Sequence, residues 1–159
     1  MKKVAFIIQH LTNGGAERTI SNLSMILQGR CEVYLIIFDG SNVSYPYAGK
    51  MIDLALPPRD SLRGKVLNVI RRTWAIRKLK KRHQFDCVIS FMFGSNVVNA
   101  LSGHVGKTVT SARNYMSVYG TGPIARFKEK YTAFKSDVVV SLSKMVGADL
   151  EHAFGVPAE

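Results

Sequence analysis

The sequence has only two cysteines and no long apolar run, and each shortage excludes a class of protein. Cys31 and Cys87 lack the spacing of metal ligands and lie beside or within strand-like apolar segments, which predicts two buried, reduced thiols and no disulfide. No segment approaches the roughly 18 consecutive apolar residues of a membrane-spanning helix. The first apolar run ends at Gln9, which makes it too short for a signal peptide. We therefore expect a cytoplasmic protein.

Acidic side chains are also scarce: 11 Asp and Glu stand against 22 Lys and Arg, which gives a formal net charge of +11. Such an excess is typical of proteins with a polyanionic partner, such as nucleic acid, anionic lipid headgroups or phosphorylated substrates. The sequence has no zinc-ligand spacing, RNP-like aromatic motif or sustained basic zipper, which argues against a nucleic-acid partner. A membrane surface or a phosphorylated substrate fits the charge better.

Apolar strands alternate with helical patterns over the 159 residues, 47% of which are hydrophobic, as expected for one globular domain. We expect strands at residues 3–9, 32–38, 51–54, 86–91, 108–110 and 137–142, and helices at about 16–27, 62–82, 96–101, 124–134 and 143–154. Pro123 suits a first helical turn, Ser143 an N-cap and Gly155 a helix end. The alternation predicts an α/β fold, a doubly wound, Rossmann-like parallel sheet of about six strands with helices on both faces.

The segment between the first strand and the first helix, His10 to Arg18, is the most informative loop. In doubly wound sheets, ligands bind beyond the carboxyl ends of the strands. Gly14 and Gly15 expose backbone amides at a helix N-terminus, where the partial positive charge favours phosphate. Neither GxGxxG nor a P-loop ending in GK[ST] is present, which disfavours dinucleotide-dependent dehydrogenases and ATPases. The alternative is that the glycines serve only the tight turn.

Four segments together resemble family 4 retaining glycosyltransferases, which have the GT-B fold of two Rossmann-like domains. They are HLTNGGAERTISNLS after the first strand, DCVISFMFGSNVVNAL, TVTSARN and DVVVSLSKMVGADLEHAFGVP, in the same order and at similar spacings. The resemblance implies that residues 1–159 are the acceptor-binding N-terminal domain, and that the C-terminal domain, which binds a nucleotide-diphosphate sugar, is absent. The donor-site signature of two Glu residues belongs to that domain, so this chain alone is expected to be inactive.

The resemblance also assigns roles to residues at the strand ends. It places Gly14 and Gly15 against the donor phosphates or the transferred sugar. Candidate acceptor or cleft residues are His10, Asn13, Arg18, Ser95, Asn96, Arg113 and Asn114. For Ser95 and Asn96 the alternative is the start of a short helix. Related sequences often have an acidic residue where this one has Ala112. No general base is evident. The resemblance implies that none is needed, because such enzymes are thought to let the departing diphosphate accept the acceptor's proton. No metal or other cofactor is expected.

A strongly basic helix is predicted between Ser61 and Gln84, which enclose nine Lys and Arg and no acidic residue. Its apolar side chains are expected on one face: Leu62, Val66, Val69, Ile70, Ile76 and Leu79. The candidates for contact with an anionic membrane are Arg71, Arg72, Trp74, Arg77, Lys78, Lys80, Lys81 and Arg82. The alternative is a solvated outer face of a helix that packs on the sheet.

These patterns lead to one main hypothesis and two rivals. The main hypothesis is the acceptor-side half of a hexosyl or related transferase that builds a cell-surface polysaccharide or glycolipid, such as a capsule. Its partners would be its own C-terminal domain, a nucleotide sugar, a lipid-linked or glycan acceptor and the inner face of the cell membrane. One rival is a noncatalytic module of the same fold that recruits a transferase or a membrane. The other is a different GT-B enzyme, such as an epimerase.

Overall fold

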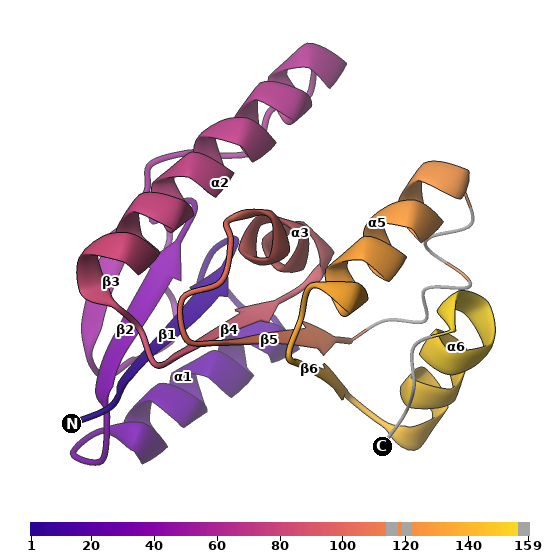
Figure 1. Cartoon of the computed structure of the whole chain (residues 1–159). Helices are drawn as coiled ribbons and strands as arrows, with labels where there is room; N and C mark the ends of the chain where they lie inside the picture. Colours follow the sequence, from indigo (N-terminus) through magenta and orange to yellow (C-terminus); the bar gives the residue numbers. More distant parts are fainter. Residues whose placement is uncertain (114–117, 119–121, 156–159) are drawn as a thin grey trace.

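The computed structural model describes residues 1–113, 118 and 122–155, and its centre is one parallel β-sheet covered by helices (Figure 1). The strands are β1 (Lys3–Ile8), β2 (Glu32–Ile37), β3 (Lys50–Asp53), β4 (Cys87–Phe91), β5 (Lys107–Ala112) and β6 (Val138–Ser141). They lie in the order β3-β2-β1-β4-β5-β6, and neighbouring strands are parallel. The chain therefore builds outward from β1 in one direction and then, from β4, in the other.

Helices cover both faces of this sheet, which confirms the predicted α/β, doubly wound fold. They are α1 (Gly15–Leu27), α2 (Leu62–His83), α3 (Phe93–Leu101), α5 (Pro123–Phe134) and α6 (Lys144–Phe154). Helix α1 lies on one face, whereas α2, α3 and α5 lie on the other (Figure 1). Helix α6 packs beside β6, where Leu150 meets Val139 and Ala112. Because β1 and β4 are neighbours, the change in strand order falls between their carboxyl ends, the place where such folds bind ligands.

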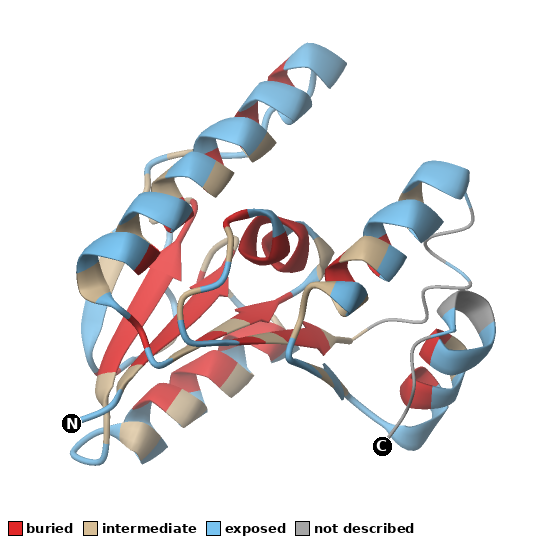
Figure 2. Cartoon of the chain, viewed as in Figure 1, coloured by how far each residue is buried: buried red, intermediate tan, exposed pale blue. Residues whose placement is uncertain are grey.

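The core has two parts because side chains alternate across the sheet. On one face, Phe6 of β1 and Leu35 of β2 pack against Ile20 of α1. On the other face, Ile7 and Ile36 pack with Ile76 of α2, and Val98 of α3 joins them. Figure 2 shows this buried core in red along the central strands. Continuous apolar strands are thus explained by burial on both faces.

The helix ends largely follow the sequence signals. Ser143 caps α6 by accepting a hydrogen bond from the Val146 amide, and Gly155 ends that helix with φ of 66°. Pro123 occupies the first turn of α5, as predicted. Both cysteines are free. Among the described residues, no helix is both long and apolar enough to span a bilayer.

Candidate functional site

The N-terminus of α1 lies at the carboxyl edge of the sheet, where the change in strand order falls between β1 and β4. Gly14 is its N-cap residue, with extended backbone angles (φ −94°, ψ 164°), and no side chain caps the helix. The first helical hydrogen bond runs from the Arg18 amide to the Gly14 carbonyl at 3.0 Å. The amides of the first turn are therefore left without an intrahelical acceptor, and they carry the partial positive charge of the helix. This geometry suits an anion such as a phosphate.

Glu17 folds back over this helix start and lies close to Gly14. A β-carbon built on Gly14 would lie 2.1 Å from Oε2 of Glu17, whereas one built on Gly15 would meet nothing within 4 Å. Oε1 of Glu17 lies 3.3 Å from Nδ1 of His10, which is also 2.9 Å from the Thr12 hydroxyl. Glu17 is only 8% exposed. It therefore joins the end of β1 to the first turn of α1.

Arg113 reaches the same helix from the end of β5. Its Nη1 donates to the Thr19 hydroxyl at 3.1 Å, and that hydroxyl donates to the Gly15 carbonyl at 2.8 Å. The guanidinium lies 4.8 Å above the Phe91 ring. Burial lowers the pKa of Arg113, and the charge of Glu17 opposes that shift. His10, after β1, and Arg113, after β5, thus meet the Glu17 carboxylate of α1 near the start of that helix, and β4 supplies the Phe91 ring beneath the guanidinium.

The prediction that Ser95 and Asn96 line a cleft is corrected by the structure. Helix α3 begins at Phe93, three residues earlier than expected, since the chain turns within Met92 at a left-handed φ of 73°. Ser95 and Asn96 therefore lie inside the helix and are 2% and 4% exposed. Asn96 donates to the Ser111 carbonyl at 3.0 Å. Asn96 thus holds α3 against β5, whereas the Ser95 hydroxyl is buried without a hydrogen-bond partner among the described residues, and neither side chain faces solvent at the edge of the sheet.

Other predicted cleft residues are placed in different ways. Asn13 and Arg18 are exposed at the start of α1, next to the glycines. Asn114 lies outside the described residues. Over the part of the chain that the structure describes, no three His, Cys, Asp or Glu side chains come close enough together to hold a metal ion.

Arg72 was predicted to face a membrane, and the structure shows that it faces the protein. Arg72 is 8% exposed. The guanidinium donates through Nε and Nη2 to the Leu56 carbonyl and through Nη1 to Oε1 of Gln9. It also lies 4.4 Å from the centre of the Phe38 ring. Burial lowers the pKa of Arg72, and the nearby charge of Asp39 opposes that shift. Arg72 therefore ties α2 to the carboxyl end of β1.

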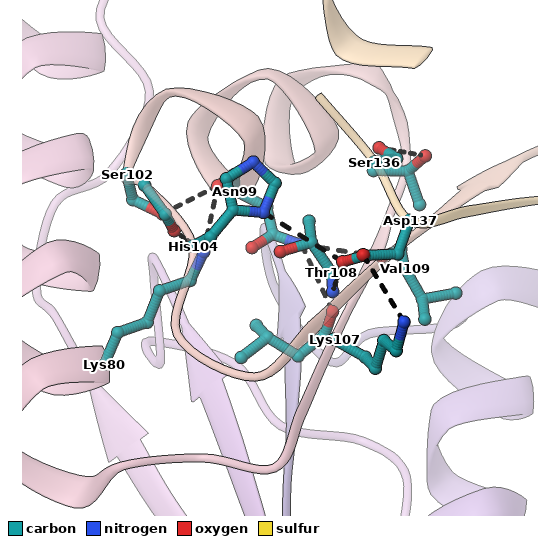
Figure 3. A network of polar contacts seen from close by, with 12 residues as sticks. Lys80, Asn99, Ser102, His104, Lys107, Thr108, Val109, Ser136 and Asp137 are labelled. Carbon is teal, nitrogen blue, oxygen red and sulfur yellow. Dashed lines mark hydrogen bonds and ion pairs between the residues drawn. The ribbon is translucent and has the colours of Figure 1, made fainter. Parts of the chain in front are cut away.

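Lys80 is the second basic residue that was wrongly assigned to the surface. It is 1% exposed, and its ammonium group donates to the carbonyls of Asn99 and Gly103 at 3.0 and 2.8 Å (Figure 3). These carbonyls lie at the C-terminal end of α3, where a cation is favoured by the helix dipole. Burial lowers the pKa of Lys80 to about 8. Its role is to join α2 to α3.

The other membrane candidates are exposed, as expected: Arg71, Trp74, Arg77, Lys78, Lys81 and Arg82. The predicted apolar face of α2 is nevertheless only partly buried. Ile76 is fully buried, whereas Leu62, Val66 and Ile70 are 79%, 56% and 59% exposed. The helix therefore packs on a different stripe of residues than its apolar pattern indicated.

Sequence reasoning missed the roles of Glu17, Thr19 and Arg72. Nothing in a local pattern links Glu17 to His10 or places Arg113 nearby. Asp39 could have been named as a candidate site residue from the sequence, because it directly follows the buried Phe38 at the edge of the sheet where ligands bind. Hydrogen bonds from Ser41 lower the pKa of Asp39, and the charges of His10 and Arg72 contribute.

Comparison with known proteins agrees with this geometry. The model of Glycosyltransferase Family 4 matches residues 13–159. A curated Campylobacter jejuni protein, named GalNAc-alpha-(1->4)-GalNAc-alpha-(1->3)-diNAcBac-PP-undecaprenol alpha-1,4-N-acetyl-D-galactosaminyltransferase, is 32% identical over 99 residues, which are 61% of this chain and 28% of that protein.

Solved structures share the fold at low sequence identity. Sucrose-phosphate synthase from Thermosynechococcus elongatus superposes with a TM-score of 0.75 at 13% identity, over 97% of this chain and 45% of that one. The apo lipopolysaccharide outer core galactosyltransferase WaaB gives 0.61 at 15% identity, over 95% of this chain and 42% of that one. The chain thus spans less than half the length of each of these proteins.

Proposed function

Because the chain belongs to glycosyltransferase family 4, we propose that it is the acceptor-side domain of an enzyme that transfers a sugar, with retention of configuration, from a nucleotide-diphosphate sugar to a lipid-linked or polysaccharide acceptor. A C-terminal domain beyond these residues would hold most of the donor. The observation that carries the proposal is the N-terminus of α1, whose N-cap residue Gly14 makes no side-chain cap, at the edge of the sheet where β1 and β4 end. The amides of its first turn, which include that of exposed Gly15, suit the donor's diphosphate.

The proposed chemistry needs position and charge from this domain more than a proton acceptor. The bond between the sugar's anomeric carbon and the diphosphate breaks, and a bond to the acceptor oxygen forms on the same face of the sugar. The acceptor's proton passes to an oxygen of the departing diphosphate. The amides of Gly15 and its neighbours would stabilise the charge that develops on that leaving group. Glu17, the carboxylate in this first turn, is only 8% exposed, and its Oε1 lies 3.3 Å from Nδ1 of His10.

Several finer points are part of the same proposal. The Campylobacter relative is named for an acceptor that carries undecaprenyl diphosphate, which favours a lipid-linked acceptor and a place on the inner face of the cell membrane for this protein too. We propose a hexosyl-type donor. We also propose that no metal or other cofactor is needed, since a basic side chain and the amides at a helix N-terminus can neutralise the diphosphate. Exposed Asn13 and Arg18, beside the glycines, are the proposed side-chain contacts to substrate.

Replacing Gly15 with Ala tests the proposal, because a methyl group there meets nothing within 4 Å and creates no conflict inside the domain. In the complete protein, assayed with a panel of nucleotide sugars and an undecaprenyl-diphosphate saccharide, Gly15→Ala should lower kcat/KM at least tenfold by blocking close approach to the amides. The melting temperature should stay unchanged. Gly122→Ala, at the start of α5 and also in open space, is the matched control.

The outcomes separate the proposal from its rival. Product formation by the complete wild-type protein, with the anomeric configuration read by NMR, supports a retaining transferase. If the complete protein neither transfers nor hydrolyses any sugar nucleotide, the noncatalytic module becomes the better interpretation. Full activity in Gly15→Ala would refute the role of the α1 amides while leaving the transferase assignment intact.

A further inference from the structure

The first half of α2 exposes a continuous stripe of apolar side chains to solvent. Leu62, Val66, Ile70 and Trp74 follow one another at intervals of four residues, and Leu67 lies beside them. Their exposed fractions run from 46% to 79%. A shallow groove is lined by Leu62, Arg63, Val66, Leu67 and Ile70. Contiguous apolar surface of this kind on a soluble domain usually marks a place where something binds.

This stripe is not part of the domain's own packing. The residues of α2 that face the protein are Gly64, Asn68, Arg72, Ile76 and Lys80, on another side of the helix. Near its start α2 rests on the loop before it, where Asn68 donates to the Pro57 carbonyl at 2.6 Å. A β-carbon on Gly64 would come within 3.0 Å of the Arg59 side chain. Polar contacts thus fix the inner side of the first half of the helix, and the apolar residues Leu62, Val66 and Ile70 of that half lie outside, whereas Ile76 of the second half packs into the core.

Cations surround and continue the stripe. Arg63, Lys65, Arg71, Arg77, Lys78 and Lys81 are exposed on α2, and the helix contains no acidic residue. The Lys78 ammonium lies 5.5 Å from the centre of the Trp74 ring, so the aromatic and charged parts of the surface meet. Apolar side chains with a tryptophan and flanking cations match the boundary between acyl chains and anionic headgroups.

We propose that this outer face of α2 docks on an anionic lipid bilayer. The apolar stripe enters the headgroup boundary, while the second half of the helix lies along the lipid phosphates. Helix α2 runs antiparallel to the strands, so its apolar first half projects on the carboxyl side of the sheet; α1 also starts on that side, but on the opposite face of the sheet (Figure 1). The proposed docking does not depend on transferase activity. It rests on the proposed function only in what it would achieve, which is to bring the carboxyl edge of the sheet close to a lipid-linked acceptor.

Two sets of variants separate the charged and the apolar contributions. The charge set is Arg71→Gln, Arg77→Gln and Lys78→Gln, which omits Arg72 and Lys80 because both are buried. Its control removes three exposed cations from other surfaces: Lys2→Gln, Arg30→Gln and Lys144→Gln. The apolar set is Ile70→Gln with Trp74→Gln, and its control is Met25→Gln with Ile26→Gln on α1, on the other face of the sheet.

Vesicle sedimentation gives the readout with the purified protein. Vesicles of phosphatidylcholine with about one third phosphatidylglycerol should bind it at low salt, and vesicles of phosphatidylcholine alone should not. Since each well-placed cation contributes about a factor of five, the charge set should weaken binding roughly 100-fold and its control much less. The apolar set should weaken it about tenfold. Raising the salt from about 0.05 M to about 0.5 M should release most of the protein.

Other results would overturn the proposal. Equal losses in the charge set and its control would show attraction by net charge alone. A sedimentation-velocity shift to a dimer that the apolar set abolishes would assign the face to a second copy of the chain. Binding to an RNA or DNA oligonucleotide that exceeds vesicle binding and is lost in the charge set would assign it to nucleic acid. Each measurement is independent of transferase activity, so failure here leaves the proposed function standing.

Discussion

Helices α1 and α2 cover opposite faces of one sheet and differ in the balance of polar and apolar contacts that hold them. Helix α1 packs Ala16 and Ile20 into the core, together with buried serines. Helix α2 buries Ile76 as well, but it also turns Asn68, Arg72 and Lys80 inward and leaves Leu62 and Ile70 outside. The difference shows that polar contacts can hold much of a helix while many of its apolar residues remain available to bind something else. The predictions that follow test this contrast, from the largest expected effect to the smallest.

Isoleucine pairs on the two helices test where each helix is packed. Ile20 and Ile76 are fully buried, so truncation to Ala should lower the free energy of unfolding by about 3 to 4 kcal/mol in each case. Ile26 and Ile70 are 61% and 59% exposed, and Ala there should change it by less than about 0.5 kcal/mol. Urea denaturation measures all four variants. A large loss for Ile70→Ala would mean that the outer stripe of α2 is packed after all.

Lys80 should make the stability of the protein depend on pH. The pKa of Lys80 is about 8 in the folded protein, below its ordinary value of 10.5. Between pH 8 and pH 10.5 the unfolded chain therefore holds the Lys80 proton more tightly than the folded protein does, and the free energy of unfolding rises with pH. The rise should be on the order of 3 kcal/mol. Below about pH 8 the penalty is fully present. Subtracting the profile of Lys80→Met isolates this contribution, whereas Lys81→Met, on the exposed neighbour, should leave the profile unchanged. Identical profiles for wild type and Lys80→Met would contradict a buried ammonium.

Arg71 and Arg72 are adjacent arginines with different surroundings. Arg72→Ala leaves the Leu56 carbonyl and Oε1 of Gln9 without their donor, so it should lower the free energy of unfolding by about 2 kcal/mol. Arg71→Ala removes an exposed side chain and should change stability by less than about 0.5 kcal/mol. For vesicle binding the order should reverse, with Arg71→Ala the more harmful. Similar effects of both variants in both assays would remove the distinction between the two sides of α2.

The fold could be predicted from the sequence because its strands are short, apolar and separated by helical segments. Buried parallel strands such as Lys3–Ile8 and Glu32–Ile37 need apolar side chains on both faces, and that requirement is visible locally. The bounds of α2 were also close to those predicted, because Ser61 supplies a capping hydroxyl and Gln84 ends the helix in a left-handed conformation. These features depend on neighbours in the chain.

The buried side of α2 could not be predicted in the same way. The carbonyls that hold it belong to Leu56 and Pro57 in the preceding loop, to Asn99 in the last turn of α3 and to Gly103 just after that helix. An apolar pattern shows which residues favour burial, but it does not show where the backbone leaves acceptors that need a donor. The contact of Arg113 with Thr19 spans 94 residues and escapes local patterns for the same reason.

The contact between Gly14 and Glu17 has a consequence for how this loop can evolve. A β-carbon at position 14 would collide with the Glu17 carboxylate, so a larger residue there requires Glu17 to swing away from His10 or to be replaced by a shorter one. Since the colliding atoms are the far end of a flexible side chain, the main loss on enlarging residue 14 is the contact between Glu17 and His10. Substitutions at the two positions should therefore be non-additive: once residue 17 is too short to reach His10, alanine at position 14 should have little further effect.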